Sequence, residues 1–357
     1  MERIDFRLAD SQDNEGILRL LHSMTMPGEI ELLYKKSPDF FHAAEIQGFA
    51  HQALVACRED GEIVALGTRS LKHVYVNGIP QVIGYLGDLR ISPHARHLHI
   101  LANGYAEMGR LMTDGRALLH LTTIVEGNRN AKAALTWKNR HRSIPTYHDL
   151  GRIDTSFVFP VLWKHRRHSC QIRRGCKDNL PEIVDFLRHI AVTRQFYPVY
   201  TCDFFQNLRD FQPENFYLAY QNNRLVGVTA LWDQTGFKQM TVKKYNGKMA
   251  LFKRFLGRIL PDEETEISHA YLSFIAIQDD DPDIFGTLLS HIYNDVRHSG
   301  IRYFIVGFHE RDPLGKAMKG YPKLTYQSRL YAADYKEDAE IQALLDPRIP
   351  YVEIATL

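Results

Sequence analysis

The chain of 357 residues is 45% hydrophobic and 24% charged, and its formal net charge is +2. This length suggests two domains, the composition excludes extensive disorder, and the near-neutral charge gives no general reason to expect binding to nucleic acid or a membrane. The first residues lack the apolar core of a signal peptide, and no stretch approaches the ~18 apolar residues of a membrane span. The four cysteines lack the short paired spacings of a zinc site or a disulfide framework. We therefore expect a cytoplasmic protein without a metal.

The chain opens with the pattern of a strand, a helix cap and an amphipathic helix, and this order recurs in its second half. Residues 6–10 precede apolar residues at helical spacing over 17–21, and residues 172–176 precede a similar pattern over 183–187. Pro181 stands where the first turn of a helix tolerates proline. A predicted hairpin then follows in each half, over 53–67 with a turn at Asp60-Gly61 and over 216–229 with a turn at Asn222-Asn223. Such self-similarity indicates a duplicated unit.

Each half continues with a strand, a helix, a strand, a short helix and a closing strand. In the first half we expect these elements over 82–91, 94–114, 118–126, 131–138 and 154–161, and in the second half over 270–277, 282–297, 301–308, 313–319 and 327–335. One additional helix is expected over 243–260. A basic run separates the halves, so we predict domains over 1–162 and 170–357, joined by a linker over 163–169.

The segment from Asp88 to Ala102 combines the end of a strand, a turn with Pro93 and the start of a long helix. The first N–H groups of a helix lack internal partners and lie at the positive end of its dipole. A diphosphate is therefore expected to bind there.

The same segment resembles the V-x-P-x-x-R-x-x-G-x-G motif of the GNAT acyl-CoA N-acyltransferases, through Ile91, Pro93 and Arg96. The resemblance in the order of elements covers nearly the whole chain, twice. It implies an α/β (α+β) fold of two tandem domains, each with a mixed, mostly antiparallel central sheet flanked by helices. It also implies acyl-CoA as the donor substrate.

Carried over by position, the resemblance implies that the end of the strand pairs with pantetheine and that the turn holds the diphosphate. The implied donor-binding residues are Leu89, Arg90, Ile91, Arg96, His97, Leu98, His99, Ile100, Leu101, Asn128 and Asn130. His99 and Leu101 depart from the motif, because the family has glycine at both positions for close approach of the backbone. His99 either crowds the phosphate or donates a hydrogen bond to it.

Candidate catalytic residues follow from the reaction that the resemblance implies. An ammonium must lose its proton before it attacks a thioester, so a carboxylate near the strand is expected, and Asp88 and Glu126 are the candidates. Burial on an apolar strand is expected to raise the pKa of Asp88. Either carboxylate could instead pair with an arginine. Trp137 stands where many members have a tyrosine that protonates the leaving thiolate, so Tyr147 is the alternative acid, unless it is only a surface residue.

The second half lacks this motif. Its corresponding junction carries Asp279, Asp280, Asp281 and Asp283, which would repel a diphosphate and which suit helix capping. We therefore expect the second half to shape the acceptor pocket without binding acyl-CoA.

The sequence thus predicts an enzyme that transfers an acyl group directly to a primary amine of a small molecule or peptide, with acetyl-CoA as the expected donor and another acyl-CoA as the alternative. Two alternatives remain open. One is a non-catalytic acyl-CoA-binding or regulatory protein, and the other is a tRNA-dependent aminoacyl-transferase of the tandem type, which the basic residues over 164–168 permit. The near-neutral chain favours neither nucleic acid nor a membrane as partner.

Overall fold

The computed structural model describes residues 3–26, 28–136, 143–165, 169–255, 257, 260–335 and 338–357. Trp137 lies outside these ranges. The side chains of Arg96, His97 and Leu98, and those of residues 252, 255, 338, 339 and 342, also lie outside the described part.

The first half contains strands and helices in the order β1 (Asp5–Leu8), α1 (Asn14–His22), β2 (Ile30–Lys35), α2 (Phe40–Ala44), β3 (Ala50–Cys57), β4 (Ile63–Val76), β5 (Ile79–Ile91), α3 (Ile100–Met112), β6 (His120–Val125), α4 (Arg129–Thr136) and β7 (Thr146–Val158).

The second half repeats this order with additions, except that a 3-10 turn over Pro313–Met318 takes the place of α4. It contains β8 (Gln171–Arg174), α5 (Leu180–Ala191), β9 (Arg194–Gln195), α6 (Cys202–Gln206), β10 (Phe216–Gln221), β11 (Arg224–Asp233), β12 (Gln239–Tyr245), α7 (Gly247–Phe255), β13 (His269–Ile277), α8 (Pro282–Arg297), β14 (Tyr303–His309), β15 (Lys323–Asp334), α9 (Asp338–Leu344) and β16 (Ile349–Pro350).

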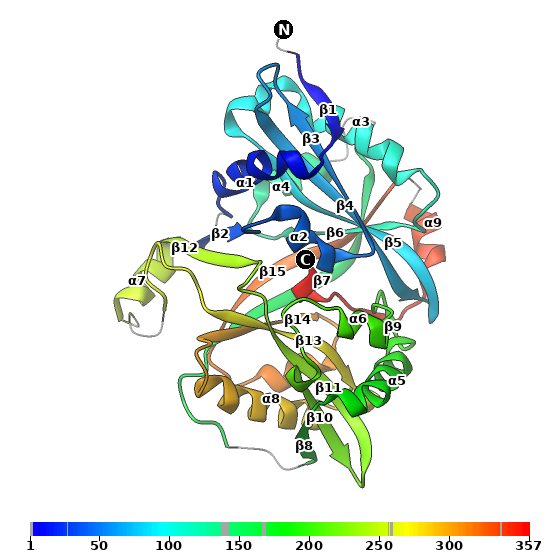
Figure 1. The fold of residues 1–357 in the computed structure, drawn as a ribbon, viewed down its shortest axis with the longest axis vertical. Coiled ribbons are helices and arrows are strands. Elements are labelled where there is room, and N and C mark those ends of the chain that lie inside the picture. The colour runs from blue at the N-terminus through cyan, green and yellow to red at the C-terminus, as the bar shows by residue number, and fades with distance from the viewer. Residues whose placement is uncertain are drawn as a thin grey trace.

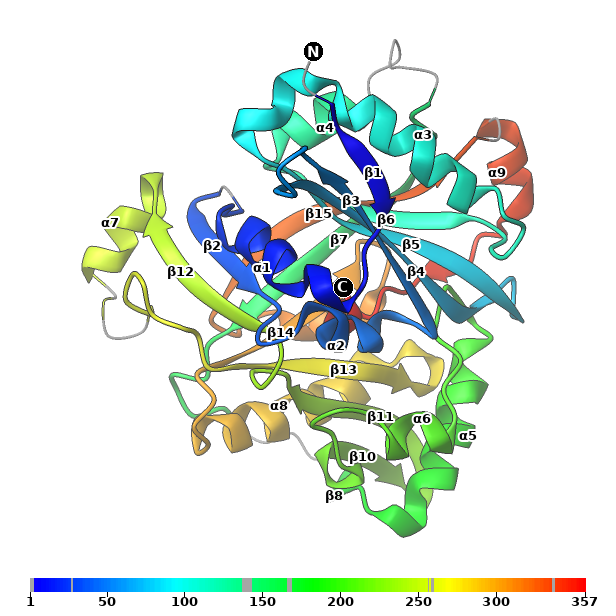
Figure 2. The ribbon, with the colours of Figure 1, turned by 45° about the horizontal axis from the view of Figure 1, so that its top comes forward.

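One twelve-stranded sheet runs through both halves in the order β1-β3-β4-β5-β6-β15-β7-β14-β13-β11-β10-β8 (Figures 1 and 2). Most neighbours are antiparallel, and β5 pairs with β6, and β13 with β14, in parallel. The mixed α/β architecture of the prediction is confirmed. Helices cover both faces of the sheet. Alternate residues of a strand point to opposite faces, so Val55 of β3 packs with α1 on one face, and Leu54 packs with α3 on the other.

The two closing strands are exchanged between the halves. β15 lies between β6 and β7, and β7 pairs with β14 of the second half. From the sequence, each closing strand is expected to complete its own half. An apolar strand pattern indicates that a strand is buried but does not identify the strand with which it pairs. The exchange could therefore not be predicted from the pattern.

Several local predictions are confirmed. The hairpin of β3 and β4 turns at Gly61, whose φ is 85°, and that of β10 and β11 turns at Asn222 and Asn223, whose φ values are 49° and 59°. These are left-handed conformations that glycine and asparagine adopt most readily.

Other elements differ from the expectation. The helix expected over 94–114 is divided into a 3-10 turn over Pro93–Leu98 and α3. β2 and β12 were not predicted, and they pair with each other in a two-stranded sheet that joins the halves. α7 covers only Gly247–Phe255 of the helix expected over 243–260, and it projects from the body of the molecule beside β12 (Figure 2). None of the helices in the described ranges has the length and apolar character needed to span a membrane.

Candidate active site

A gap opens between β5 and β6. The two strands pair only at Gly84 with His120 and at Tyr85 with Leu121, although β5 continues to Ile91. Gly84 permits the close approach at the base of the gap, since a Cβ atom there would lie 2.1 Å from Cδ2 of His120. The unpaired ends of the two strands therefore present backbone polar groups to the space between them.

A bulge in β5 faces this gap. The register with β4 skips between Leu66, which pairs with Arg90, and Thr68, which pairs with Gly87. The extra residues include Asp88, whose φ of 49° lies in the left-handed region that aspartate tolerates better than most residues. Bulges of this kind redirect a side chain at a functional site.

A cavity of about 320 Å³ lies at the gap. Both halves contribute to its wall, the first through β3 to β6, α3 and α4, and the second through Lys238, Tyr271, Ile305 and Tyr326. Of the residues predicted for the site, the cavity is lined by Asp88, Leu89, Arg90, Ile91, Ile100, Leu101, Asn128 and Tyr147. His99, Glu126 and Asn130 do not line it.

The turn after β5 shows why the family motif has glycine at the position of His99. His99 ends the 3-10 turn with a φ of 53°, the conformation that glycine adopts at least cost, and its side chain is exposed. The α-helix therefore begins at Ile100. Ile100 and Leu101 of its first turn line the cavity, and no side chain in the described part caps this helix N-terminus. The imidazole of His99 does not fill the turn.

Asp88 forms an ion pair with Lys36, with Oδ2 and Nζ 2.5 Å apart, and both side chains are largely buried. Burial alone would raise the pKa of Asp88, but the Lys36 ammonium outweighs it and holds the pKa below its usual value. The raised pKa expected from the sequence is therefore wrong. A carboxylate that an ion pair holds in its ionised form is better suited to orienting an amine than to taking a proton from it.

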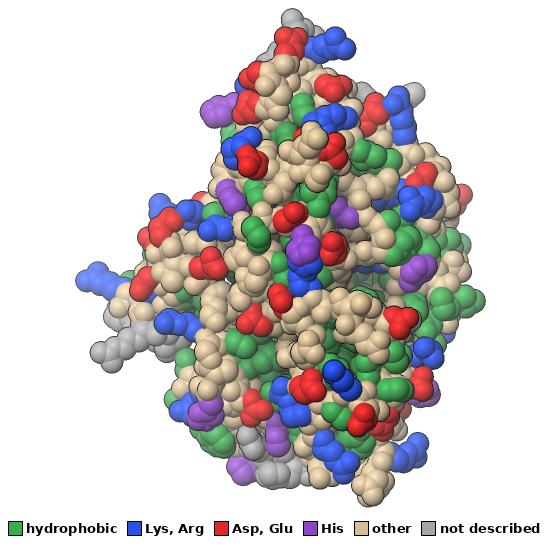
Figure 3. Space-filling model, in the orientation of Figure 1, with side chains coloured by type: hydrophobic (Ala, Val, Ile, Leu, Met, Phe, Trp, Pro, Cys, Tyr) green, Lys and Arg blue, Asp and Glu red, His purple; other side chains and the backbone are tan. Residues whose placement is uncertain are grey.

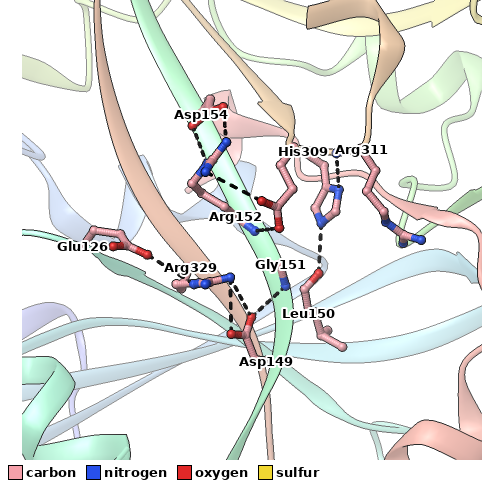
Figure 4. A network of polar contacts seen from close by, with 10 residues as sticks. Glu126, Asp149, Leu150, Gly151, Arg152, Asp154, His309, Arg311 and Arg329 are labelled. Carbon is pink, nitrogen blue, oxygen red and sulfur yellow. Dashed lines mark hydrogen bonds and ion pairs between the residues drawn. The ribbon is translucent and has the colours of Figure 1, made fainter.

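Glu126, directly after β6, belongs to a polar network with residues within β7 and β15 and with Glu310, directly after β14 (Figure 4). Its carboxylate lies 3.2 Å from Nε of Arg329, which also pairs with Asp149 at 3.3 Å. Nearby, Arg152 of β7 pairs with Asp154 at 2.9 Å and with Glu310 at 3.8 Å. The pairing of Glu126 with an arginine is the alternative that the sequence analysis left open for it.

The remaining predicted residues have different surroundings. The hydroxyl groups of Tyr147 and Tyr105 lie 2.5 Å apart at the cavity wall, and burial raises the pKa of Tyr105 to about 12. The side-chain oxygen of Asn128 accepts a hydrogen bond from the N–H of Ala131 and so caps α4. Asn130 is exposed.

Besides Lys36, sequence reasoning missed two further lysines, namely Lys238, which is buried, and Lys72, which is half-buried. Lys238 lines the cavity directly before β12, and its Nζ donates to the main-chain oxygens of Ala355 at 3.3 Å and Leu357 at 2.6 Å. Nζ of Lys72 donates to the main-chain oxygen of Thr356 at 3.2 Å. Burial lowers the pKa of Lys238 to about 7 and that of Lys72 to about 8. The only feature of the local sequence that could have indicated burial is that each lysine stands within a largely apolar stretch.

The acidic junction of the second half forms internal contacts. Asp281 caps α8 by accepting a hydrogen bond from the N–H of Asp283 at 2.7 Å, and Asp280 forms an ion pair with Arg194, which also pairs with Asp312. Within the described ranges, no group of three or more His, Cys, Asp or Glu side chains is arranged to hold a metal ion.

Comparison with known proteins shows which solved structures share this fold. No protein-family model and no curated protein matches the sequence. Among solved structures, Saccharomyces cerevisiae N-myristoyltransferase with bound myristoyl-CoA is similar over 94% of this chain and 84% of its own, with a TM-score of 0.62 and 10% identity. A GCN5-related glucosamine N-acetyltransferase region of a fungal multi-domain β-N-acetylglucosaminidase aligns with 93% of this chain and 38% of its own (TM-score 0.62, 11% identity). A probable N-acyltransferase from Enterococcus faecalis aligns with 93% and 73% (TM-score 0.52, 11% identity).

The chain therefore has the GNAT acyltransferase fold. The similarity to the N-myristoyltransferase structures spans both halves of the chain.

Proposed function

We propose that the protein is an acyl-CoA-dependent N-acyltransferase, which binds its donor in the gap between β5 and β6 and its amine acceptor from the side of the second half. The gap with its bulge and cavity carries this proposal, because backbone groups at a splayed strand can pair with the amides of pantetheine while the start of α3 faces the phosphates. The acyltransferases among the structural neighbours support it.

The chemistry needs one base and one acid. The neutral amine attacks the thioester carbonyl, the C–S bond breaks, and the leaving thiolate takes up a proton while the amine nitrogen loses one. Lys238 has the pKa best suited to accept the proton of the acceptor ammonium, since it is about 7 and its Nζ lies at the cavity. Asp88 would orient the amine, and Tyr147 would donate to the thiolate.

The test is release of free thiol from acyl-CoA over a panel of amines and amino-terminal peptides. Because the base must be neutral, we expect the rate with the preferred acceptor to rise with pH through about 7 and to level off above it. Lys238→Met should lower the rate by about a hundredfold and abolish that rise. Lys243→Met, which removes a half-exposed lysine of β12, is the matched control and should leave the profile unchanged. A flat profile from pH 6 to 9, or a rise that persists without Lys238, would count against this assignment.

The length of the acyl chain is a separate prediction. Apolar side chains from β3, β5, β6, α3 and α4 line the cavity, and we call the part that they line its apolar lobe, namely Leu54, Leu86, Met108, Ile124 and Leu135. Each buried methylene contributes about 0.8 kcal/mol. We therefore expect affinity to rise about tenfold for every two added methylenes until the lobe is full, measured by calorimetric titration from acetyl-CoA to myristoyl-CoA. Equal affinities along the series would show that the lobe does not receive the chain and would favour acetyl-CoA.

The two alternative functions give different results in the same experiments. A non-catalytic acyl-CoA-binding protein would bind the donor without releasing thiol from any acceptor. A tRNA-dependent transferase would not bind acyl-CoA, and it would need a basic surface. On the face shown in Figure 3, however, lysine and arginine side chains are interspersed with aspartate and glutamate.

A further inference from the structure

The second half has a gap that matches the first in detail. β13 and β14 pair in parallel from His269 with Tyr303 to Tyr271 with Ile305, and β13 then continues to Ile277. The register between β11 and β13 skips between Val228 and Ala230, as that between β4 and β5 skips between Leu66 and Thr68.

The bulge is repeated as well. Phe274 follows Tyr271 at the same distance in sequence as Asp88 follows Tyr85, and its φ of 57° is likewise in the left-handed region. The second gap is therefore the structural counterpart of the proposed donor site. Ile275 corresponds to Leu89 of that site.

In the second gap, side chains of this same chain bind the exposed backbone groups. The carboxylate of Glu353 accepts a hydrogen bond from the N–H of Phe274 at 2.8 Å. The hydroxyl of Tyr351 accepts from the N–H of Ile275 at 3.3 Å and donates to Glu353 at 2.8 Å, while Tyr197 donates to the carbonyl of Ile275 at 3.2 Å. In the first half, no described side chain accepts from the corresponding N–H groups of Asp88 and Leu89.

These contacts are built into the core. Tyr197 is fully buried and its ring lies against that of Tyr351, with ring centroids 4.3 Å apart and planes tilted by 37°, and Glu353 is only 5% exposed. Burial raises the pKa of Glu353, and the donors from Phe274 and Tyr351 oppose that effect. A buried carboxylate is stable only where donors of this kind surround it.

The occupied gap is continuous with the wall of the first cavity. Glu353 caps the short turn over Ile354–Thr356. The main-chain oxygens of this turn and of Leu357 are the acceptors for Lys72 and Lys238. Ile354 and Leu357 line the cavity.

We infer that the second gap has become the binding site for the chain's own segment over 349–357, and that Glu353 is the positioning residue that sets where Ile354 and Leu357 stand in the wall of the first cavity. The chain consequently has one donor site, although it has two gaps of the same design. The occupancy of the second gap is independent of the proposed function, whereas the role of the cavity wall rests on it.

Hydrogen exchange of the segment over 349–357 tests the inference. Glu353→Met keeps the size of the side chain and removes its acceptors, so we expect the amides of this segment to exchange at least about tenfold faster. Glu353→Gln retains an oxygen for Phe274 and Tyr351, and its exchange should stay within about threefold of the wild type. Equal protection in Glu353→Met and the wild type would overturn the inference. Should Glu353→Met not fold, Tyr351→Phe removes one hydroxyl only, and unchanged exchange in that variant would overturn it equally.

Calorimetry with myristoyl-CoA separates this inference from the proposed function. We expect one equivalent bound per chain in the wild type and in Glu353→Gln. With an acceptor from the amine panel, Glu353→Met should raise the acceptor KM at least about tenfold while the donor Kd changes less than about twofold. Two equivalents per chain, or a KM equal to that of the wild type, would contradict the inference. Absence of donor binding together with the expected exchange pattern would instead refute the proposed function and leave the occupied gap in place.

Discussion

Lys36→Met is expected to lower the free energy of unfolding by about 3 kcal/mol, because it leaves the buried carboxylate of Asp88 without its cation. The Lys36 side chain is 10% exposed and that of Asp88 17%. Burial would then act on Asp88 unopposed by this cation, and the pKa of its carboxyl would rise. Denaturant unfolding measured near pH 7 gives the free energy directly.

The neighbouring Lys35 provides the matched control. Lys35→Met changes the same residue type one position earlier in β2, where the side chain is less buried, and it should change stability by less than about 0.5 kcal/mol. The double variant Lys36→Met/Asp88→Asn removes both charges, and asparagine tolerates the left-handed backbone there. It should recover most of the loss. A double variant as unstable as Lys36→Met would show that the ion pair is not the cause.

Gly104→Trp is expected to weaken acyl-CoA binding by about a hundredfold, which corresponds to about 2.7 kcal/mol. Gly104 lies on α3 at the cavity wall, and a Cβ atom there would lie 3.5 Å from Cε1 of Phe6. That is an ordinary contact, so the backbone accepts a side chain. The indole ring would then occupy the space proposed for the donor.

Asn103→Trp places the same ring on the exposed side of α3 one residue earlier, and its affinity should equal that of the wild type. Calorimetric titration of both variants with the same acyl-CoA makes the comparison. Wild-type affinity in a folded Gly104→Trp variant would place the donor elsewhere.

The sequence predicted those parts of the fold that depend on short-range patterns. The hairpins followed from the turn residues Asp60-Gly61 and Asn222-Asn223, because glycine and asparagine readily adopt the positive φ values seen at Gly61, Asn222 and Asn223. The strand, turn and helix after Asp88 followed from periodicity and from Pro93. Only the helix start was displaced, because the left-handed backbone at His99 separates a 3-10 turn from α3.

The parts that were missed depend on contacts between distant segments. The exchange of β7 and β15 concerns which strands are neighbours, and β2 pairs with β12 across more than half of the chain. The partners of Asp88 could not be predicted for the same reason. Lys36 reaches it from the position directly after β2, and its charge reverses the pKa shift that burial alone would cause.

Titration of the wild-type protein with myristoyl-CoA, followed by hydrogen exchange of the complex, tests the central proposal most directly. We expect one bound equivalent per chain and new protection from exchange at residues 86–91 and at the first turn of α3. No binding of any acyl-CoA, or protection confined to segments outside the gap between β5 and β6, would contradict it.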